Sequence, residues 1–186
     1  MPIRQAVLAS TCAAFVAVAP AWGQTVTLED LRGSVIEATL VFEQHGLANG
    51  RFVSDTYRVD RQMTFGSGDT VQDNVTRTVE GAKRTRRQSG SGSYTLGQAR
   101  EVSNFGGGHV VYLFSNGALT ILRTYKEGGQ KVEIAFTRDP AGIGCSIRAP
   151  YAREKGGDVQ MTGLFGAHLQ HWTQKQISSS CRVSKR

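Results

Sequence analysis

The residues best placed to do chemistry are a run of cations in the middle of the chain. They are Lys83, Arg84, Arg86 and Arg87, and Tyr94 follows them a few residues later. A guanidinium group binds phosphate, sulfate or carboxylate through two parallel hydrogen bonds, and a tyrosine ring can stack on a flat ligand. These five residues are therefore a candidate site for an anionic partner. Two other interpretations stay open, a flexible charged hairpin tip and an edge strand that its cations keep from pairing.

Two histidines three residues apart, His168 and His171, form the pattern nearest to a metal site. On a helix they would share a face, but the alternation of residues from Ile177 onward predicts a strand, on which they point to opposite faces. The motif holds no glutamate that could act as the base of a zinc protease, and no third ligand is evident. We therefore predict surface or loop histidines and no cofactor. His168 and His171 remain weak metal candidates.

The sequence lacks the residue patterns of common hydrolases. Its Gly-Ser-Gly segments at 66–68 and 90–92 do not have the form of a nucleophile elbow, and no phosphate-binding loop occurs. Acid pairs such as Asp69 with Asp73 lie on segments that also carry basic residues, which favours solvated pairs across neighbouring strands. We therefore assign no catalytic residue and favour a protein that is not an enzyme. The alternative is a hydrolase whose acids and histidines converge only in the folded chain.

The first 23 residues have the form of a secretory signal peptide. A positive start at Arg4 is followed by an uncharged, apolar run over Ala6–Ala19, and Ala21-Trp22-Gly23 offers small residues at the spacing that signal peptidase reads. An apolar run of this length is too short to span a bilayer as a helix. We therefore predict a signal peptide over residues 1–23, export, and a mature chain without a transmembrane segment.

Export changes the meaning of the cysteines. Cys12 leaves with the predicted leader, and Cys145 and Cys181 remain as an even pair. In an oxidising compartment such a pair is most simply a disulfide. If chain entropy accounts for its effect, closing a loop of this size stabilises the fold by roughly 4 kcal/mol. We therefore predict a Cys145–Cys181 disulfide.

The elements that must position these residues are strands. In one segment Tyr57, Val59, Met63 and Phe65 fall on one face, and the residues between them are mostly polar. This period of two is the signature of a sheet with one side on a core and the other in water. Arg61 lies on the apolar face and interrupts it.

Tight turns connect the predicted strands. Asn116-Gly117 separates two apolar runs, and this dipeptide is the strongest local hairpin signal because both residues tolerate a positive φ. One short helical turn is predicted at Thr27–Leu31, with a threonine or aspartate cap. The sequence therefore predicts an all-β domain over residues 24–186, a single antiparallel up-and-down β-barrel of about 8–10 strands. A β-sandwich is the alternative.

Three short motifs, together with the leader, resemble those of small exported β-rich proteins of alphaproteobacteria. The motifs are Leu31–Ile36, Cys145–Ile147 and Cys181–Val183. The resemblance covers most of the mature chain. It implies a periplasmic or secreted protein of a Gram-negative bacterium, and it assigns no catalytic residue.

The charge and the missing catalytic motifs favour a binding module. The formal net charge is +7, which attracts anionic partners. We expect an exported, non-enzymatic protein that binds a small or lipid-like ligand in a barrel mouth, or an anionic envelope polymer or lipid head group on its basic side. Nucleic acid is a disfavoured partner. The alternatives are a periplasmic or secreted hydrolase with a site not visible in the sequence, and a structural or adhesive surface protein.

Overall fold

The computed structural model describes residues 25–48, 50–80, 85–102, 108–125, 128–149, 161–162 and 168–185. Within them the chain forms one short helix and eleven strands. In chain order these are α1 Leu28–Leu31, β1 Ser34–Ala48, β2 Arg51–Phe65, β3 Thr70–Glu80, β4 Thr85–Thr95, β5 Ala99–Val102, β6 Gly108–Ser115, β7 Ala118–Tyr125, β8 Gly128–Asp139, β9 Gly142–Arg148, β10 Met161–Thr162 and β11 His168–Lys185. The predicted all-β class and the short N-terminal helical turn are confirmed. The predicted signal peptide, residues 1–23, lies outside the described residues.

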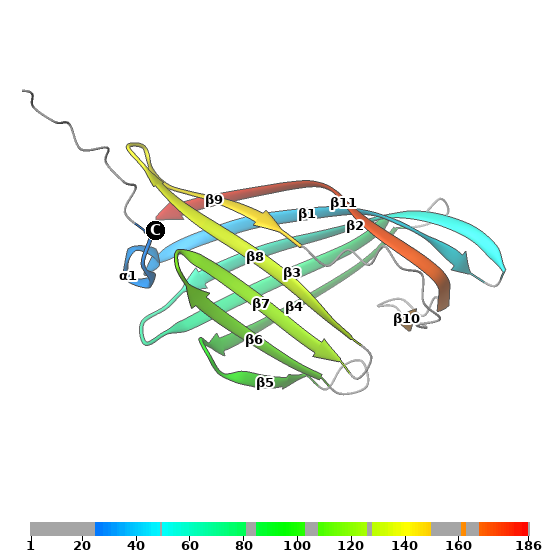
Figure 1. Cartoon of the computed structure of the whole chain (residues 1–186), viewed down its shortest axis with the longest axis horizontal. Coiled ribbons are helices and arrows are strands. Elements are labelled where there is room, and N and C mark those ends of the chain that lie inside the picture. Colours follow the sequence, from blue (N-terminus) through cyan, green and yellow to red (C-terminus); the bar gives the residue numbers. More distant parts are fainter. Residues whose placement is uncertain are drawn as a thin grey trace, which may run out of the picture.

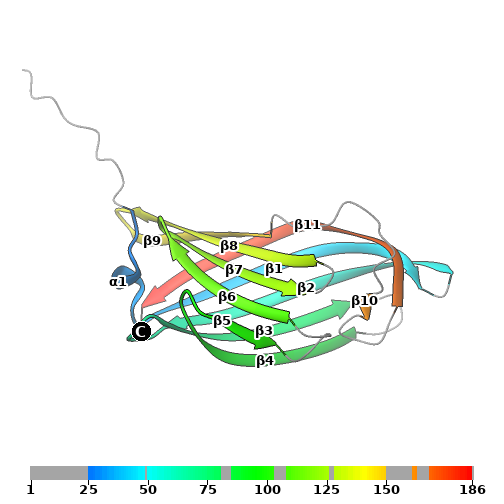
Figure 2. The ribbon, with the colours of Figure 1, turned by 60° about the horizontal axis from the view of Figure 1, so that its bottom comes forward.

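The strands form two antiparallel sheets that face each other (Figures 1 and 2). The larger sheet has the order β10-β11-β1-β2-β3-β4, and the smaller has the order β5-β6-β7-β8-β9. Most neighbours in a sheet are also neighbours in sequence, as in an up-and-down arrangement. The described strands do not form one closed ladder, however. The fold therefore corresponds to the predicted β-sandwich alternative and not to a single closed barrel.

The ladder is interrupted at two seams between the sheets. At the first, the turn after β4 contains Gly97, whose φ of 77° suits glycine, and the Gly97 N–H donates to the Tyr112 carbonyl at 2.8 Å. This contact directs β5 into the second sheet, where it pairs with β6. At the second seam, between β9 and β11, the Ala149 N–H donates to the Gln176 side chain at 2.9 Å. Contacts of these kinds hold the sheets together without continuing the ladder.

One hydrophobic core fills the space between the sheets, and one end of it is closed by the segment around α1. Phe65 of β2 packs edge-on against Phe114 of β6 and Phe136 of β8, with 6.3 Å between ring centroids in each pair. Val26 and Leu31 are buried in the same core. We call these five residues the capped end of the interior.

Side chains at the start of α1 fix the helix to the smaller sheet. Thr27 caps the helix, and the Asp30 carboxylate accepts the Thr27 N–H at 2.8 Å. The same carboxylate forms an ion pair with Arg138 on β8 at 2.5 Å. Hydrogen bonds from Arg138 and Thr27 hold the pKa of Asp30 far below its usual value. The position of α1 over the capped end therefore follows from a local capping motif and one ion pair.

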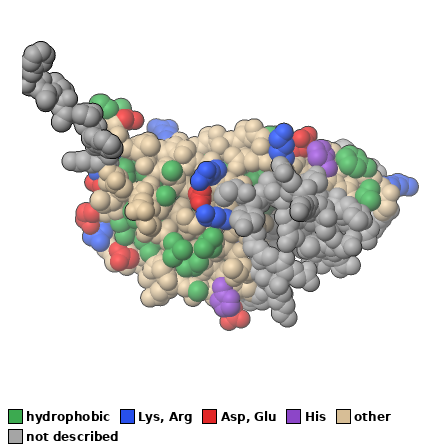
Figure 3. All heavy atoms as spheres, viewed as in Figure 1, with side chains coloured by type: hydrophobic (Ala, Val, Ile, Leu, Met, Phe, Trp, Pro, Cys, Tyr) green, Lys and Arg blue, Asp and Glu red, His purple; other side chains and the backbone are tan. Residues whose placement is uncertain are grey.

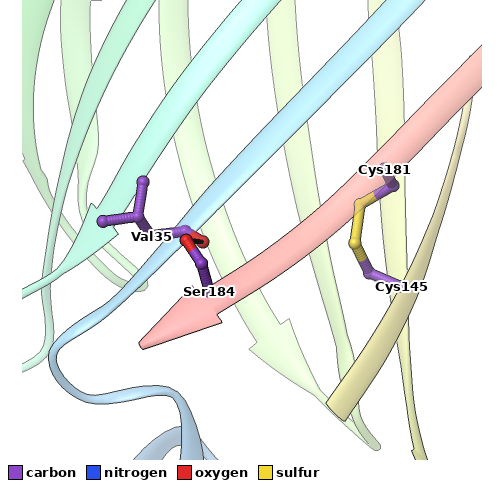
Figure 4. Close-up of a disulfide and its surroundings, with 4 residues drawn as sticks. All are labelled: Val35, Cys145, Cys181 and Ser184. Atoms are coloured by element: carbon purple, nitrogen blue, oxygen red, sulfur yellow. Dashed lines mark hydrogen bonds between the residues drawn. A yellow bond between two sulfur atoms is a disulfide. The ribbon is translucent and has the colours of Figure 1, made fainter. Parts of the chain in front are cut away.

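A disulfide joins the two sheets at the β9–β11 seam (Figure 4). It links Cys145 to Cys181, with 5.5 Å between the Cα atoms. The predicted disulfide is confirmed. Nearby, the Ser184 hydroxyl donates to the Val35 carbonyl at 3.4 Å, between the paired strands β11 and β1. Among the described residues, no helix is long and apolar enough to cross a membrane.

Candidate ligand-binding site between the sheets

A charged cluster lies inside the sandwich, next to the capped end. The Arg61 guanidinium forms an ion pair with the Asp73 carboxylate, and their side chains are only 4 % and 1 % exposed. The Tyr112 hydroxyl, which is fully buried, donates to Asp73 Oδ2 at 2.6 Å. We call Arg61, Asp73 and Tyr112 the interior cluster.

Strand alternation and register bring the interior cluster together. Arg61 alternates along β2 with Val59 and Met63, which are both buried, so its side chain lies on the inward face. On β3, Asp73 is the register partner of Met63, so Arg61 and Asp73 are diagonal neighbours on one face. Tyr112 comes from β6 in the opposite sheet. The cluster therefore bridges the two sheets through the core.

Tyr94 covers the interior cluster from the edge strand β4. Its ring stacks on Tyr112 with 4.3 Å between centroids and 22° between planes. Gly92 makes room for the ring, because a Cβ atom at that position would lie 2.7 Å from the Tyr94 hydroxyl oxygen. Arg100 lies over the ring, 5.5 Å from its centroid, and donates to the Ser93 carbonyl at 3.0 Å. These contacts close the β4 seam at the level of the cluster.

Two members of the interior cluster, Arg61 and Tyr112, have fixed protonation states near neutral pH. Burial is the largest effect on Arg61 and disfavours its charged form, but the Asp73 carboxylate together with Tyr112 and Tyr57 outweighs it, so the pKa of Arg61 stays above its usual value. Burial, supported by the charge of Asp73, raises the pKa of Tyr112 far above its ordinary value of 10.0. Arginine and tyrosine therefore neither release nor accept a proton near neutral pH. These two side chains are therefore suited to holding a molecule and not to general acid–base catalysis.

Two buried polar atoms of the cluster have no partner. Neither Arg61 Nε nor Asp73 Oδ1 has a hydrogen bond within the part of the chain that the structure describes. Buried polar groups in proteins are nearly always paired, and each exception calls for an explanation. One atom is a donor and the other an acceptor. A bound molecule with polar groups, or water, would satisfy both.

The predicted anionic site is not brought together within the described residues. Lys83 and Arg84 lie outside them, and nothing is described of the Arg86 side chain beyond its place on β4. Arg87 is exposed on the outer face, where its charge helps to lower the pKa of Asp60. Tyr94 lies inward at the other end of β4, about 23 Å away along the strand at roughly 3.3 Å per residue. An anionic partner on the basic run stays a prediction.

The face of the molecule in Figure 3 shows no large basic patch among the described residues. Lys and Arg side chains are scattered there and stand beside acidic ones. Glu133 illustrates the pairing, since it binds both Lys131 and Arg148. The described cations on this face are therefore scattered and do not form one patch.

The two histidines belong to β11, so the strand predicted from Ile177 onward begins earlier, at His168, and the histidines do not lie in a loop. The side chains of His168 and His171 lie outside the description. Among the described residues, no three His, Cys, Asp or Glu side chains gather in a way that could hold a metal ion. The metal interpretation of the two histidines stays untested.

Sequence reasoning missed Asp73 and Tyr112 as parts of a site. The interpretation of Asp73 as part of a solvated pair was wrong, because its side chain is buried between the sheets. The signal was available in the alternation, since Val71, Asp73 and Val75 occupy one face of β3 just as Arg61 occupies the apolar face of β2. A cation and an anion that interrupt apolar faces of adjacent strands are expected to meet.

Comparisons with protein-family models, with curated proteins and with solved structures found no match for the chain.

Proposed function

We propose that the chain is an exported binding protein that holds a small, lipid-like molecule between its two sheets, beside Arg61, Asp73 and Tyr112. The observation that carries the proposal is the pair of unpartnered atoms, Arg61 Nε and Asp73 Oδ1, inside the core. They offer a donor and an acceptor among core side chains that are otherwise apolar or aromatic. This combination is typical of small-molecule sites, which pair an apolar lining with a few placed polar groups.

The energetics of a buried ion pair support a role other than stability. Removing two charges from water costs free energy that their attraction recovers only with good geometry and full hydrogen bonding. Apolar residues of similar volume often stabilise a fold as well or better. The Arg61–Asp73 pair is not fully hydrogen-bonded. Its place in the core is therefore better explained by what it binds than by what it stabilises.

The seam beside β4 supplies a route to the cluster. Gly90 lies on the inward face of β4, opposite Val75 in the register, and it is exposed. A Cβ atom built at Gly90 would meet no heavy atom within 4 Å. On the far side of Gly92 the seam is closed by Tyr94. A ligand would therefore enter beside Gly90 and reach Arg61 from the seam.

Export rests on two features that agree with each other. The predicted signal peptide directs the chain out of the cytoplasm, and disulfides such as Cys145–Cys181 persist in oxidising compartments. We place the protein in the periplasm or outside the cell of a Gram-negative bacterium.

Native mass spectrometry of protein purified from cell envelopes tests the proposal. We expect a bound molecule on the folded wild-type chain. The variant R61M/D73L/Y112F, which fills the cluster with apolar side chains of similar size, should lack it. The matched control is R58M/D60L, which removes an ion pair from the outer face of the same strand. This control should retain the bound molecule.

A fluorescence titration with N-phenyl-1-naphthylamine, a neutral apolar probe, gives an independent readout. Wild type and R58M/D60L should bind the probe equally, and R61M/D73L/Y112F should bind it at least about tenfold more weakly, since a filled site loses both its space and its polar groups. The proposal would be overturned if the wild-type chain showed only its own mass, without a bound molecule, and also failed to bind the probe. A triple variant that binds as well as wild type would overturn it too. If the triple variant does not fold, R61M/D73L, which replaces only the ion pair by apolar side chains of similar size, takes its place in both assays.

A further inference from the structure

A second arginine faces the interior from the opposite sheet. Arg123 follows Leu119 and Ile121 at alternate positions of β7, and both of those residues are buried in the core. Its side chain is partly buried, and the Nε atom is fully buried without a hydrogen-bond partner among the described residues. Arg123 therefore presents an unused donor inside the protein, as Arg61 does.

Contacts across the core place β7 opposite β2. Phe65 of β2 touches Phe114 of β6 and Phe136 of β8, and β7 lies between these two strands in the smaller sheet. On the next strand, β3, Asp73 meets Tyr112 of β6. The facing partner of β2 is therefore β7.

The two arginines also lie at a similar depth from the capped end. Along β2 the inward residues run Phe65, Met63 and then Arg61, and along β7 they run Leu119, Ile121 and then Arg123. Each arginine is thus the first inward charge beyond the apolar end on its own strand. We propose that Arg61 and Arg123 together bind the anionic head group, a carboxylate or a phosphate, of the ligand. This inference rests on the proposed function and names the chemical class of its ligand.

The charges around the two arginines favour an anion. Asp73 compensates Arg61 only, and Arg123 adds a second positive charge from the other sheet. A guanidinium with a buried, unpaired N–H is best satisfied by a charged oxygen acceptor. Arg61 and Arg123, with the single carboxylate of Asp73, therefore leave one positive charge over at this level.

Apolar residues lie just beyond the arginines and suit the rest of an amphiphile. Val59 and Leu40 are register partners on β2 and β1, and both are buried. Phe42 is buried and stacks with Tyr57 at 5.9 Å between centroids. A molecule with its head group on Arg61 and Arg123 would lay its apolar part along these side chains.

Two probes that differ in one charged group test the inference. 1-Anilinonaphthalene-8-sulfonate has the ring system of N-phenyl-1-naphthylamine and adds a sulfonate. We expect wild type to bind the sulfonate about tenfold or more tightly than the neutral probe, as one charge-assisted hydrogen bond predicts. In R123Q that preference should fall to about one, because the sulfonate loses one of its two guanidinium partners.

The control variant is R58Q, which removes the same charge from the outer face of β2, where Arg58 pairs with Asp60. It should keep the full preference for the sulfonate. An equal loss in R58Q and R123Q would assign the preference to overall charge and overturn the inference. Equal binding of both probes by wild type would overturn the inference but leave the proposed function intact. Failure of both probes would overturn both.

Competition separates the two sources of an anionic head group. Dodecanoate, dodecyl phosphate and dodecanol carry the same chain, and each would be titrated against the bound sulfonate probe. Stronger displacement by dodecanoate supports a carboxylate ligand, and stronger displacement by dodecyl phosphate supports a phosphate ligand. Displacement by dodecanol as strong as that by either anion contradicts the inference.

Discussion

Two neighbouring parts of the interior follow opposite rules. At the capped end, the described side chains that pack together are apolar, among them Phe65, Phe114, Phe136 and Leu31. A short distance further in, Arg61 forms a buried ion pair with Asp73. Arg61 Nε and Asp73 Oδ1 have no hydrogen-bond partner among the described residues. Apolar packing of the first kind supplies stability, whereas buried polar groups of the second kind are the usual mark of function. We therefore expect the capped end to stabilise the fold and the interior cluster to bind a ligand.

Strand β2 shows the same contrast within a few residues. On its outer face, Arg58 Nε donates to both oxygens of Asp60 at 2.9 Å, and the Thr39 hydroxyl donates to Asp60 at 2.7 Å. Burial alone would raise the pKa of Asp60, but the hydrogen bonds from Arg58 and Thr39 lower it below its usual value. On the inner face, the Arg61–Asp73 pair keeps one donor and one acceptor unused. One pair is exposed and complete, and the other is buried and incomplete.

The largest expected effect comes from breaking the inner pair. Arg61→Met should lower the free energy of unfolding by about 3–5 kcal/mol, because Asp73 would remain buried without a countercharge. Arg58→Met, the matched change on the outer face, should cost less than about 1 kcal/mol, since exposed ion pairs contribute little. Urea unfolding followed by circular dichroism measures both. Equal costs for the two variants would remove the contrast between the faces.

A somewhat smaller loss of stability is expected from removing the disulfide. The bond closes a separation of 36 residues, and such cross-links typically contribute about 2–4 kcal/mol by restricting the unfolded chain. C145S/C181S should therefore unfold at lower urea concentration. Because this effect acts mainly on the unfolded state, the folded variant should bind N-phenyl-1-naphthylamine with unchanged affinity. A loss of probe binding in the folded variant would show that the β9–β11 seam also shapes the interior.

A moderate and pH-dependent effect is expected from Tyr112. Folding raises the pKa of the Tyr112 hydroxyl above its ordinary value of 10.0. The hydroxyl therefore contributes its full stabilisation below pH 10.0, and this contribution is lost as the pH rises above that value. The loss should reach at most about 1.4 kcal/mol per pH unit. Tyr112→Phe should cost about 1.5–3 kcal/mol at neutral pH, where the hydrogen bond to a charged group disappears. It should also flatten the alkaline decline.

Urea unfolding of wild type and Y112F at pH 8 and pH 11 measures this effect. Tyr94→Phe is the control, since the Tyr94 ring stacks on Tyr112 and, of these two tyrosines, it is the Tyr112 hydroxyl that donates to Asp73. An alkaline decline of the same size in wild type and Y112F would contradict the role of the buried hydroxyl.

The sequence predicted the fold class better than the site, and the reason is physical. Alternation and the Asn116-Gly117 turn are local signals, so the strands and their hairpins could be predicted. The choice between barrel and sandwich depends on contacts such as the one between Gly97 and Tyr112, which joins segments that no short pattern relates. The Cys145–Cys181 pair was predictable because only two cysteines remain after the predicted leader.

The site was half visible. The position of Arg61 on an apolar strand face indicated one residue of the site. The alternation pattern of β2 alone does not indicate which residue pairs with that buried charge. In the sequence, Tyr112 is one of several apolar and aromatic residues of a predicted strand. Its hydroxyl can donate to Asp73 only because β6 packs over β3. Tyr94 was predicted to serve the basic run, whereas β4 turns its ring inward toward Tyr112. Sites formed between two sheets depend on which strands face each other, and sequence spacing does not reveal that.

The smallest change in stability is expected from Gly90→Phe. This substitution should instead lower the rate at which a ligand binds. Nothing lies within 4 Å of a Cβ atom built there, and the residue is exposed on β4. Gly90→Phe should therefore change the free energy of unfolding by no more than about 0.5 kcal/mol, as for most surface substitutions. Its ring would lie across the seam and slow the association of N-phenyl-1-naphthylamine in stopped-flow fluorescence. Gly90→Ala, which adds one methyl group, should leave that rate unchanged. If G90F binds the probe as fast as G90A, the ligand reaches the interior by another path. The proposed entry through the seam beside β4 would then be wrong.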